Sequence, residues 1–179
     1  IVHQTNHISG SAYDCRHTVP CLYNRGIPPR AYTHKVDIGD MIDSTIGTLS
    51  ELPIGVNIYL DGSGGKYTSD PRNRFCGWAW ICTNGVTSQE IGEWGTLEDE
   101  QTVPRAEAYA LYRAIKAIIL HGSGNCTYVV YSDSKVTIAR WRCIEWTEQF
   151  DDQIWHDMKC MKKVLDARLC QIDLRKVKS

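Results

Sequence analysis

The pattern of hydrophobic and polar residues divides the sequence near residue 54. After that point, hydrophobic residues alternate or recur at regular intervals. Residues 54–60 (IGVNIYL) alternate and predict a β-strand, with Ile58 and Leu60 on one face and Tyr59 and Asp61 on the other. A glycine-rich stretch, residues 61–65 (DGSGG), then predicts a loop that ends the strand.

The same periodicities predict the remaining elements. Further strands are predicted near 74–83 and 86–95, joined by a hairpin turn at Asn84-Gly85, then at 127–132 and 169–177. Helices are predicted from Thr102, a possible N-cap, to about His121, over 134–146, and from Asp151 onward. The order βββαβααβ is typical of an α/β domain in which helix-connected strands are parallel.

Residues 1–53 lack this periodicity and contain four of the six prolines. We expect a loop-rich N-terminal arm or linker here, with at most a short helix near 40–49, before a domain at 54–179. The arm also holds four of the six histidines and two cysteines, so a zinc-dependent adaptor is an alternative, although the spacing matches no common zinc finger. The residues concerned are His3, His7, Cys15, His17, Cys21 and His34.

Composition and charge exclude several classes of protein. With 20 basic and 21 acidic side chains and 42% hydrophobic residues, the chain is neither a uniformly basic nucleic-acid coat protein nor wholly disordered. The net charge is −1 over 1–53, −3 over 54–133 and +3 over 134–179, and an acidic centre can gather cations while a basic end meets a polyanion.

Hydropathy and the cysteines predict where the protein resides. No apolar run is long enough to span a bilayer, so no membrane partner is expected. The first residues do not resemble a signal peptide. We therefore expect an intracellular protein, nuclear or cytoplasmic, whose eight cysteines are reduced and mostly buried.

Three carboxylates are predicted to meet at one edge of the sheet. Asp61 ends the first strand, Asp133 ends the strand at 127–132, and Glu107 lies in the first turn of the intervening helix. At about 100° per residue, Glu107 shares the apolar helix face of Leu111 and Ile118, so its side chain points toward the sheet. Ligands of open α/β sheets bind at this edge.

Such a group of carboxylates indicates a metal site. Converged carboxylates repel one another, and Mg²⁺ prefers carboxylate and water oxygens. Two such ions about 4 Å apart form a phosphodiester hydrolysis site, in which one activates water and the other stabilises the leaving oxygen. Each residue also has a purely structural interpretation: Asp61 in a turn, Glu107 at a helix N-terminus, Asp133 as a helix cap. Their joint position and direction favour the metal site.

These residues lie in segments that resemble ribonuclease H (RNase H) of type 1, over residues 54–179. The similar segments are YLDGSG (59–64), TVPRAEAYAL (102–111) and VVYSDSKVTI (129–138), in the family's order. The TVPRAE segment is also similar to RNase H domains of retroelement (retrotransposon) polyproteins. The resemblance implies an RNase H-like mixed five-stranded sheet flanked by helices.

The resemblance further implies an endonuclease that hydrolyses the RNA strand of RNA–DNA hybrids, using Mg²⁺ or Mn²⁺. Asp61, Glu107 and Asp133 match the metal-binding carboxylates. The substrate side is matched by Gly62, Ser63, Arg105 and Ser134. Further candidates for phosphate contact are Arg140, Arg142, Lys159, Lys162 and Lys163, whereas Trp141 and Trp155 are expected to pack. Residues 1–53 would then tether the domain to an upstream reverse transcriptase domain in the same polyprotein.

The sequence departs from the family at its C-terminal end. The family has a His loop and a final helix that carries a fourth carboxylate, and residues 176–179 (KVKS) resemble the segment that leads into that loop. We therefore expect a C-terminally truncated domain, without its final helix and with weak or no activity. The alternative is a catalytically silent RNase H-like module that binds nucleic acid or supports a larger polyprotein.

Overall fold

The computed structural model describes residues 44–48, 51–65, 75–83, 89–97, 100–150 and 152–177. They all belong to one compact unit, Met41–Ser179. The histidines and cysteines of the zinc site proposed in the arm, at 3, 7, 15, 17, 21 and 34, lie outside the described residues, as does the Asn84-Gly85 turn.

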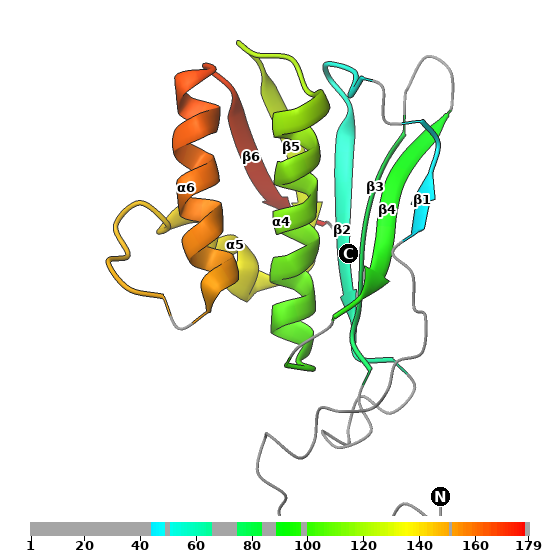
Figure 1. Ribbon diagram of the computed structural model, residues 1–179, viewed down its shortest axis with the longest axis vertical. Helices are drawn as coiled ribbons and strands as arrows, with labels where there is room; N and C mark the ends of the chain where they lie inside the picture. Colours follow the sequence, from blue (N-terminus) through cyan, green and yellow to red (C-terminus); the bar gives the residue numbers. More distant parts are fainter. Residues whose placement is uncertain are drawn as a thin grey trace, which may run out of the picture. The chain divides into compact units, whose positions relative to one another are not determined.

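The described residues form a mixed sheet with helices packed against it (Figure 1). The elements in chain order are β1 (Ser44–Ile46), β2 (Asn57–Ser63), β3 (Gly77–Thr83), β4 (Glu90–Thr96), α4 (Val103–His121), β5 (Thr127–Ser132), α5 (Lys135–Arg142), α6 (Gln153–Ala167) and β6 (Gln171–Lys176). The strand order is β1-β4-β3-β2-β5-β6. The pairs β1–β4, β4–β3 and β3–β2 are antiparallel, whereas β5 pairs parallel with both β2 and β6. The predicted α/β class and the parallel helix-connected pair β5–β6 are confirmed.

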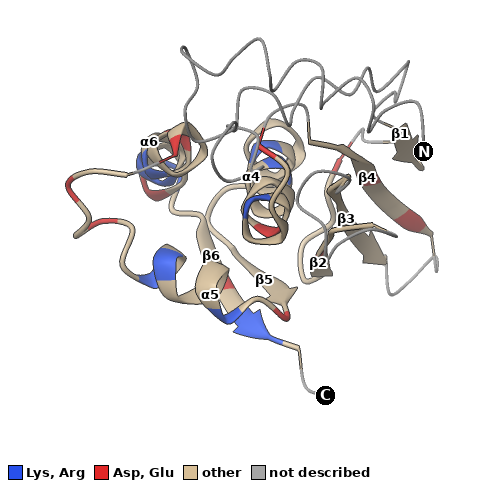
Figure 2. Ribbon diagram, turned by 90° about the horizontal axis from the view of Figure 1, so that it is seen from below, with Lys and Arg blue, Asp and Glu red and all other residues tan. Residues whose placement is uncertain are grey.

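Helices α4 and α6 lie side by side on one face of the sheet (Figure 2). Alternation along the strands supplies the apolar side chains beneath them, such as Leu60 of β2, Trp80 of β3 and Val130 of β5, all buried. Leu111 and Ile118 of α4 are buried against this layer, as the helix periodicity predicts. Trp141 and Trp155 are also buried, so the expectation that they pack is confirmed.

The sheet has six strands rather than the expected five, because β1 lies before residue 54. The sequence allowed at most a short helix near residues 40–49, but the β-branched Thr45 and Ile46 pair along the edge of β4. Leu52 is also in the core, with its N–H donating to the His121 carbonyl over 2.8 Å. The domain therefore starts before Ile54, which lies in a turn and is 65% exposed.

Strand β2 continues through residues that the sequence assigned to a loop. Asp61, Gly62 and Ser63 pair with Ala79, Trp78 and Gly77 of β3. The partner strand fixes the extended backbone despite the low strand propensity of Asp and Gly. This extension carries Asp61 to its place in the sheet.

The described cysteines are reduced, and some of them contribute to the core. The six cysteines in the described part are free thiols, and Cys76, Cys82 and Cys170 are buried. The other described cysteines are half-buried or exposed, so burial is less general than expected. None of the described helices combines the length and the apolar character that a bilayer crossing requires.

Candidate metal centre

Three carboxylates from distant parts of the sequence meet at one end of the sheet. Asp61, Glu107 and Asp133 each offer an oxygen, and these atoms lie within 4.8 Å of one another. The parallel register explains the meeting of the two aspartates: Tyr59 of β2 pairs with Tyr131 of β5, so Asp61 and Asp133, two residues further along, lie at the same level. The predicted convergence is confirmed.

Glu107 reaches the two aspartates because α4 approaches β2 very closely at Gly62. A Cβ atom added to Gly62 would lie 2.5 Å from the Glu107 backbone nitrogen and 2.8 Å from its Cγ. Only glycine permits this contact. The Gly62 N–H donates a hydrogen bond to Glu107 Oε1 over 3.0 Å, which fixes one oxygen of the carboxylate.

The three carboxylates differ in their surroundings. Asp61 and Asp133 are exposed, whereas Glu107 is only 4% exposed. Burial raises the pKa of Glu107 to about 7, and repulsion from Asp133 and, less strongly, from Asp61 adds to this rise. Hydrogen bonds from the Gly62 N–H and the Ser132 hydroxyl oppose it.

The donor set fits a hard divalent cation. All three ligand groups are carboxylates, which suit Mg²⁺ and Mn²⁺ rather than metals that favour thiolate or imidazole. A cation would also relieve the mutual repulsion that raises the Glu107 pKa. Asp61, Glu107 and Asp133 are therefore the residues that could hold such an ion. They are the only such group of three among the described residues.

The residues expected on the substrate side lie around this centre and differ in their exposure and contacts. Gly62 makes the close contact with α4, and Ser63 is exposed, its hydroxyl accepting from the Gly65 N–H over 3.1 Å. Ser134 caps α5, because its Oγ accepts from the Thr137 N–H over 3.2 Å.

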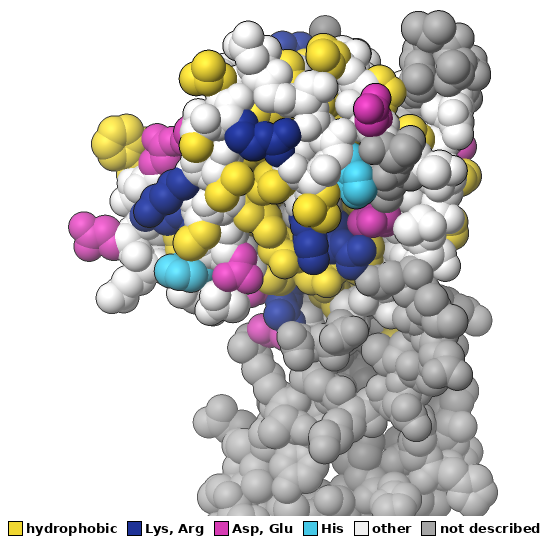
Figure 3. Space-filling view, turned by 45° about the horizontal axis from the view of Figure 1, so that its top comes forward, with side chains coloured by type: hydrophobic (Ala, Val, Ile, Leu, Met, Phe, Trp, Pro, Cys, Tyr) yellow, Lys and Arg dark blue, Asp and Glu magenta, His cyan; other side chains and the backbone are white. Residues whose placement is uncertain are grey.

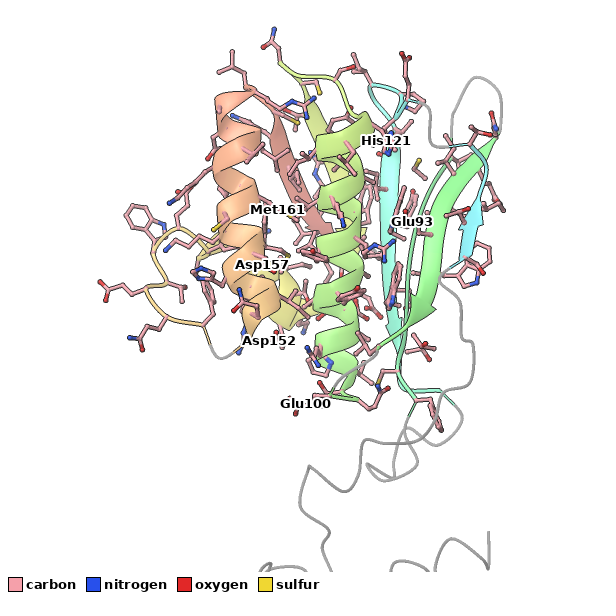
Figure 4. The ribbon with its side chains drawn as sticks, in the orientation of Figure 1. Glu93, Glu100, His121, Asp152, Asp157 and Met161 are labelled. Carbon is pink, nitrogen blue, oxygen red and sulfur yellow. The ribbon has the colours of Figure 1, made fainter. Side chains whose placement is uncertain are left out.

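Arg105, two residues before Glu107, lies near the site but is engaged in an ion pair. Its Nε donates to Asp152 Oδ2 over 3.0 Å, and the two side chains are 17% and 22% exposed. Asp152 caps α6 at the end that lies near the first turn of α4 (Figure 4). This ion pair therefore links the starts of the two helices.

The basic residues on α5 and α6 make different contacts. Lys162 lies between Glu145 and Asp166, at 2.9 and 3.1 Å, and Lys159 donates to the Thr147 carbonyl. Figure 3 shows Lys and Arg side chains interspersed with Asp and Glu on the visible face. Of the remaining candidates, Arg140 stacks over the Trp155 ring, and Arg142 and Lys163 are exposed.

Sequence reasoning missed Ser132, the last residue of β5. Its side chain is fully buried, and its Oγ lies 3.4 Å from Glu107 Oε2. The signal is present in the segment TYVVYS: the alternation that buries Tyr128 and Val130 also predicts an inward side chain at Ser132. A polar residue at such a position indicates a buried hydrogen bond.

Comparison with known proteins reveals similarity at the level of structure. No protein-family model matches the sequence, and no curated protein matches it. LC11-RNase H1, solved in complex with an RNA/DNA hybrid, is similar with a TM-score of 0.51 and 15% identity, over 68% of this chain and 84% of that chain. A foamy viral protease-reverse transcriptase in complex with dsDNA is similar with a TM-score of 0.52 and 15% identity, over 72% of this chain and 86% of that chain.

The prototype foamy virus protease-reverse transcriptase is also similar, with a TM-score of 0.51 and 17% identity, over 72% of this chain. The match spans only 18% of that chain. Together with the strand order and the position of α4 and α6 on one face, these similarities show that the chain has an RNase H-like fold.

Proposed function

We propose that the protein is an endonuclease that hydrolyses the RNA strand of RNA–DNA hybrids with Mg²⁺ or Mn²⁺. The observation that carries this proposal is the group of oxygens from Asp61, Glu107 and Asp133 within 4.8 Å of one another. They lie at the carboxyl ends of two parallel strands, the edge at which open α/β sheets bind ligands.

The three carboxylates have different roles in the proposed site. Asp61 and Asp133 are exposed and can face both an ion and an approaching phosphodiester. Glu107 is buried and hydrogen-bonded, so it holds its position beneath them. Divalent ions bound here supply a water-derived nucleophile at neutral pH and stabilise charge on the leaving oxygen. Because the carboxylates are fixed by β2, β5 and α4, the site is organised before the substrate binds.

The residues around the centre are proposed to contact the hybrid. Gly62, Ser63 and Ser134 flank the carboxylates in sequence, and their backbone and hydroxyl groups can meet the 2′-hydroxyls that distinguish an RNA strand. Arg105 can meet a phosphate if the substrate competes with Asp152 for its guanidinium. The hybrid bound by LC11-RNase H1 supports this substrate class.

We also propose that the domain acts beside a reverse transcriptase domain in a retroelement polyprotein. The similarity to foamy viral protease-reverse transcriptases supports this context. Residues 1–43 would then form part of the tether. Co-purification of the chain with a polymerase domain from the same transcript would test this arrangement.

An Asp61→Asn variant tests the proposed function. The substitution removes one ligand charge and preserves the shape of the side chain. Asp173→Asn is the matched control, because Asp173 is a strand carboxylate that pairs with Arg175 and lies outside the metal group. Labelled hybrid is incubated with excess protein in Mg²⁺ or Mn²⁺, so that slow cleavage is also detected.

The expected result is cleavage by the wild type and by Asp173→Asn. For Asp61→Asn we expect at least a hundredfold slower cleavage with retained hybrid binding. Hybrid binding without cleavage by the wild type in either ion would contradict the proposal and support the catalytically silent module. Equal cleavage by Asp61→Asn and the wild type would exclude this centre as the active site.

A further inference from the structure

Ser132 is a polar residue in a position where the fold excludes water. It ends β5 on the face that packs against α4, and its side chain is 0% exposed. A buried hydroxyl without hydrogen bonds would destabilise the fold, so its partners account for its presence.

The hydrogen bonds of Ser132 have a defined direction. The Ser134 N–H donates to Ser132 Oγ over 3.0 Å, which occupies a lone pair of the hydroxyl. The single hydroxyl proton is then available to Glu107 Oε2, at 3.4 Å. Gly62 N–H holds the other oxygen, Oε1, over 3.0 Å. Both oxygens of Glu107 therefore have a donor.

The same hydroxyl connects two of the three carboxylates. Asp133 lies in the turn between Ser132 and Ser134, and the Ser134 N–H bond to Ser132 closes this turn. Ser134 in turn caps α5, through the Thr137 N–H and hydroxyl. Ser132 thus links the turn that carries Asp133 directly to Glu107.

We propose that Ser132 is a positioning residue that sets the orientation of Glu107 relative to Asp133 for metal binding. The inference deepens the proposed function and rests on its metal centre. Groups that orient metal ligands in this way typically change metal affinity by about 10–100-fold when they are removed. Since Ser132 acts through Glu107, its effect should appear in the binding of Mn²⁺ without nucleic acid.

The test compares Mn²⁺ affinity, measured by calorimetry or electron paramagnetic resonance, with stability toward urea. Ser132→Ala removes the hydroxyl, and Ser132→Thr retains it. Thr137→Val is the matched control: Thr137 is equally buried, lies in the first turn of α5 and donates to Ser134 Oγ over 2.9 Å, but has no hydrogen bond to Glu107. If Ser132→Ala does not fold, Ser132→Cys keeps an atom of similar size with only a weak donor.

We expect roughly tenfold weaker Mn²⁺ binding by Ser132→Ala, or by Ser132→Cys. Affinity within about threefold of the wild type is expected for Ser132→Thr and Thr137→Val. Equal Mn²⁺ affinity of Ser132→Ala and the wild type would overturn the positioning role while leaving the metal centre intact. An equal loss in Thr137→Val would assign the effect to the fold of the turn and also overturn it. A wild type that binds no Mn²⁺ would refute the metal centre itself.

Discussion

At the scale of the residue, folding and metal binding favour opposite protonation states of Glu107. Folding buries its carboxyl beside two exposed aspartates, which favours the protonated form. Metal binding requires the carboxylate. The pKa of about 7 places the exchange of a proton for a cation near neutral pH.

This conflict predicts a pH-dependent stability that Glu107→Gln removes. The pKa of Glu107 is raised from 4.5 to about 7, so the folded protein binds the proton more tightly than the unfolded chain. Its contribution to stability is therefore complete below about pH 4.5 and is lost as the pH rises through about 7. We expect the stability of Glu107→Gln relative to the wild type to rise by about 2.5 kcal/mol between pH 5 and pH 8.

Urea unfolding in EDTA at both pH values measures this difference. Asp173→Asn serves as a control for the loss of an acidic side chain, since it pairs on the surface with Arg175. A pH-independent difference between Glu107→Gln and the wild type would show that Glu107 stays ionised in the folded protein.

At the scale of the element, hydrophobic periodicity predicts the helices and strands whose conformation depends on their own residues. The helix expected from Thr102 to His121 matches α4, Val103–His121, and the apolar strand at 127–132 matches β5. Thr102 does occupy the N-cap position, but its side chain makes no capping hydrogen bond. The end of β2 was missed, because its strand conformation depends on pairing with β3 rather than on its own residues.

The metal site likewise has some features that the sequence pattern predicts and others that it does not. The direction of Glu107 follows from the helix period, and its convergence with the aspartates was predicted. The hydroxyl of Ser132 and the pairing of Arg105 with Asp152 were not, because they depend on contacts between residues 25 and 47 positions apart. Such contacts are fixed by packing, which the sequence pattern alone does not specify.

The contact between β2 and α4 predicts that Gly62→Ala disrupts both fold and site. The new methyl group would meet the backbone of Glu107, which cannot move without shifting the helix. We expect a loss of about 1–3 kcal/mol in stability together with weaker Mn²⁺ binding, because Glu107 moves away from Asp61. Urea unfolding and calorimetry measure the two effects.

Gly77→Ala is the control for this prediction. Gly77 pairs with Ser63 in the neighbouring strand, and a Cβ there would make only an ordinary contact of 3.5 Å with the Gly95 carbonyl. Its stability should remain within about 1 kcal/mol of the wild type, with unchanged Mn²⁺ affinity. If Gly62→Ala behaved like Gly77→Ala, the close approach would not be what positions Glu107.

At the scale of the whole domain, one end of the sheet carries the metal centre and the other end holds contacts that stabilise α4. The end with Asp61 and Asp133 carries the metal centre. At the opposite end, where β5 begins, Arg168 donates from its guanidinium to the carbonyls of Ile119 and Gly122 and so satisfies the last turn of α4. Figure 4 labels Glu100 and His121 near the two ends of α4, and from Glu107 to His121 the helix rises about 21 Å.

This separation predicts that Arg168→Ala lowers stability without affecting the metal centre. The substitution leaves the carbonyls of Ile119 and Gly122 without their charged donor, which should cost about 1–3 kcal/mol in the free energy of unfolding. Lys163→Ala, at an exposed position of α6, should cost less than about 0.5 kcal/mol. Because sites this far apart are normally independent, both variants should bind Mn²⁺ with wild-type affinity. Weakened Mn²⁺ binding by folded Arg168→Ala would mean that α4 transmits the loss of its C-terminal cap to Glu107, and that the two ends of the domain are coupled.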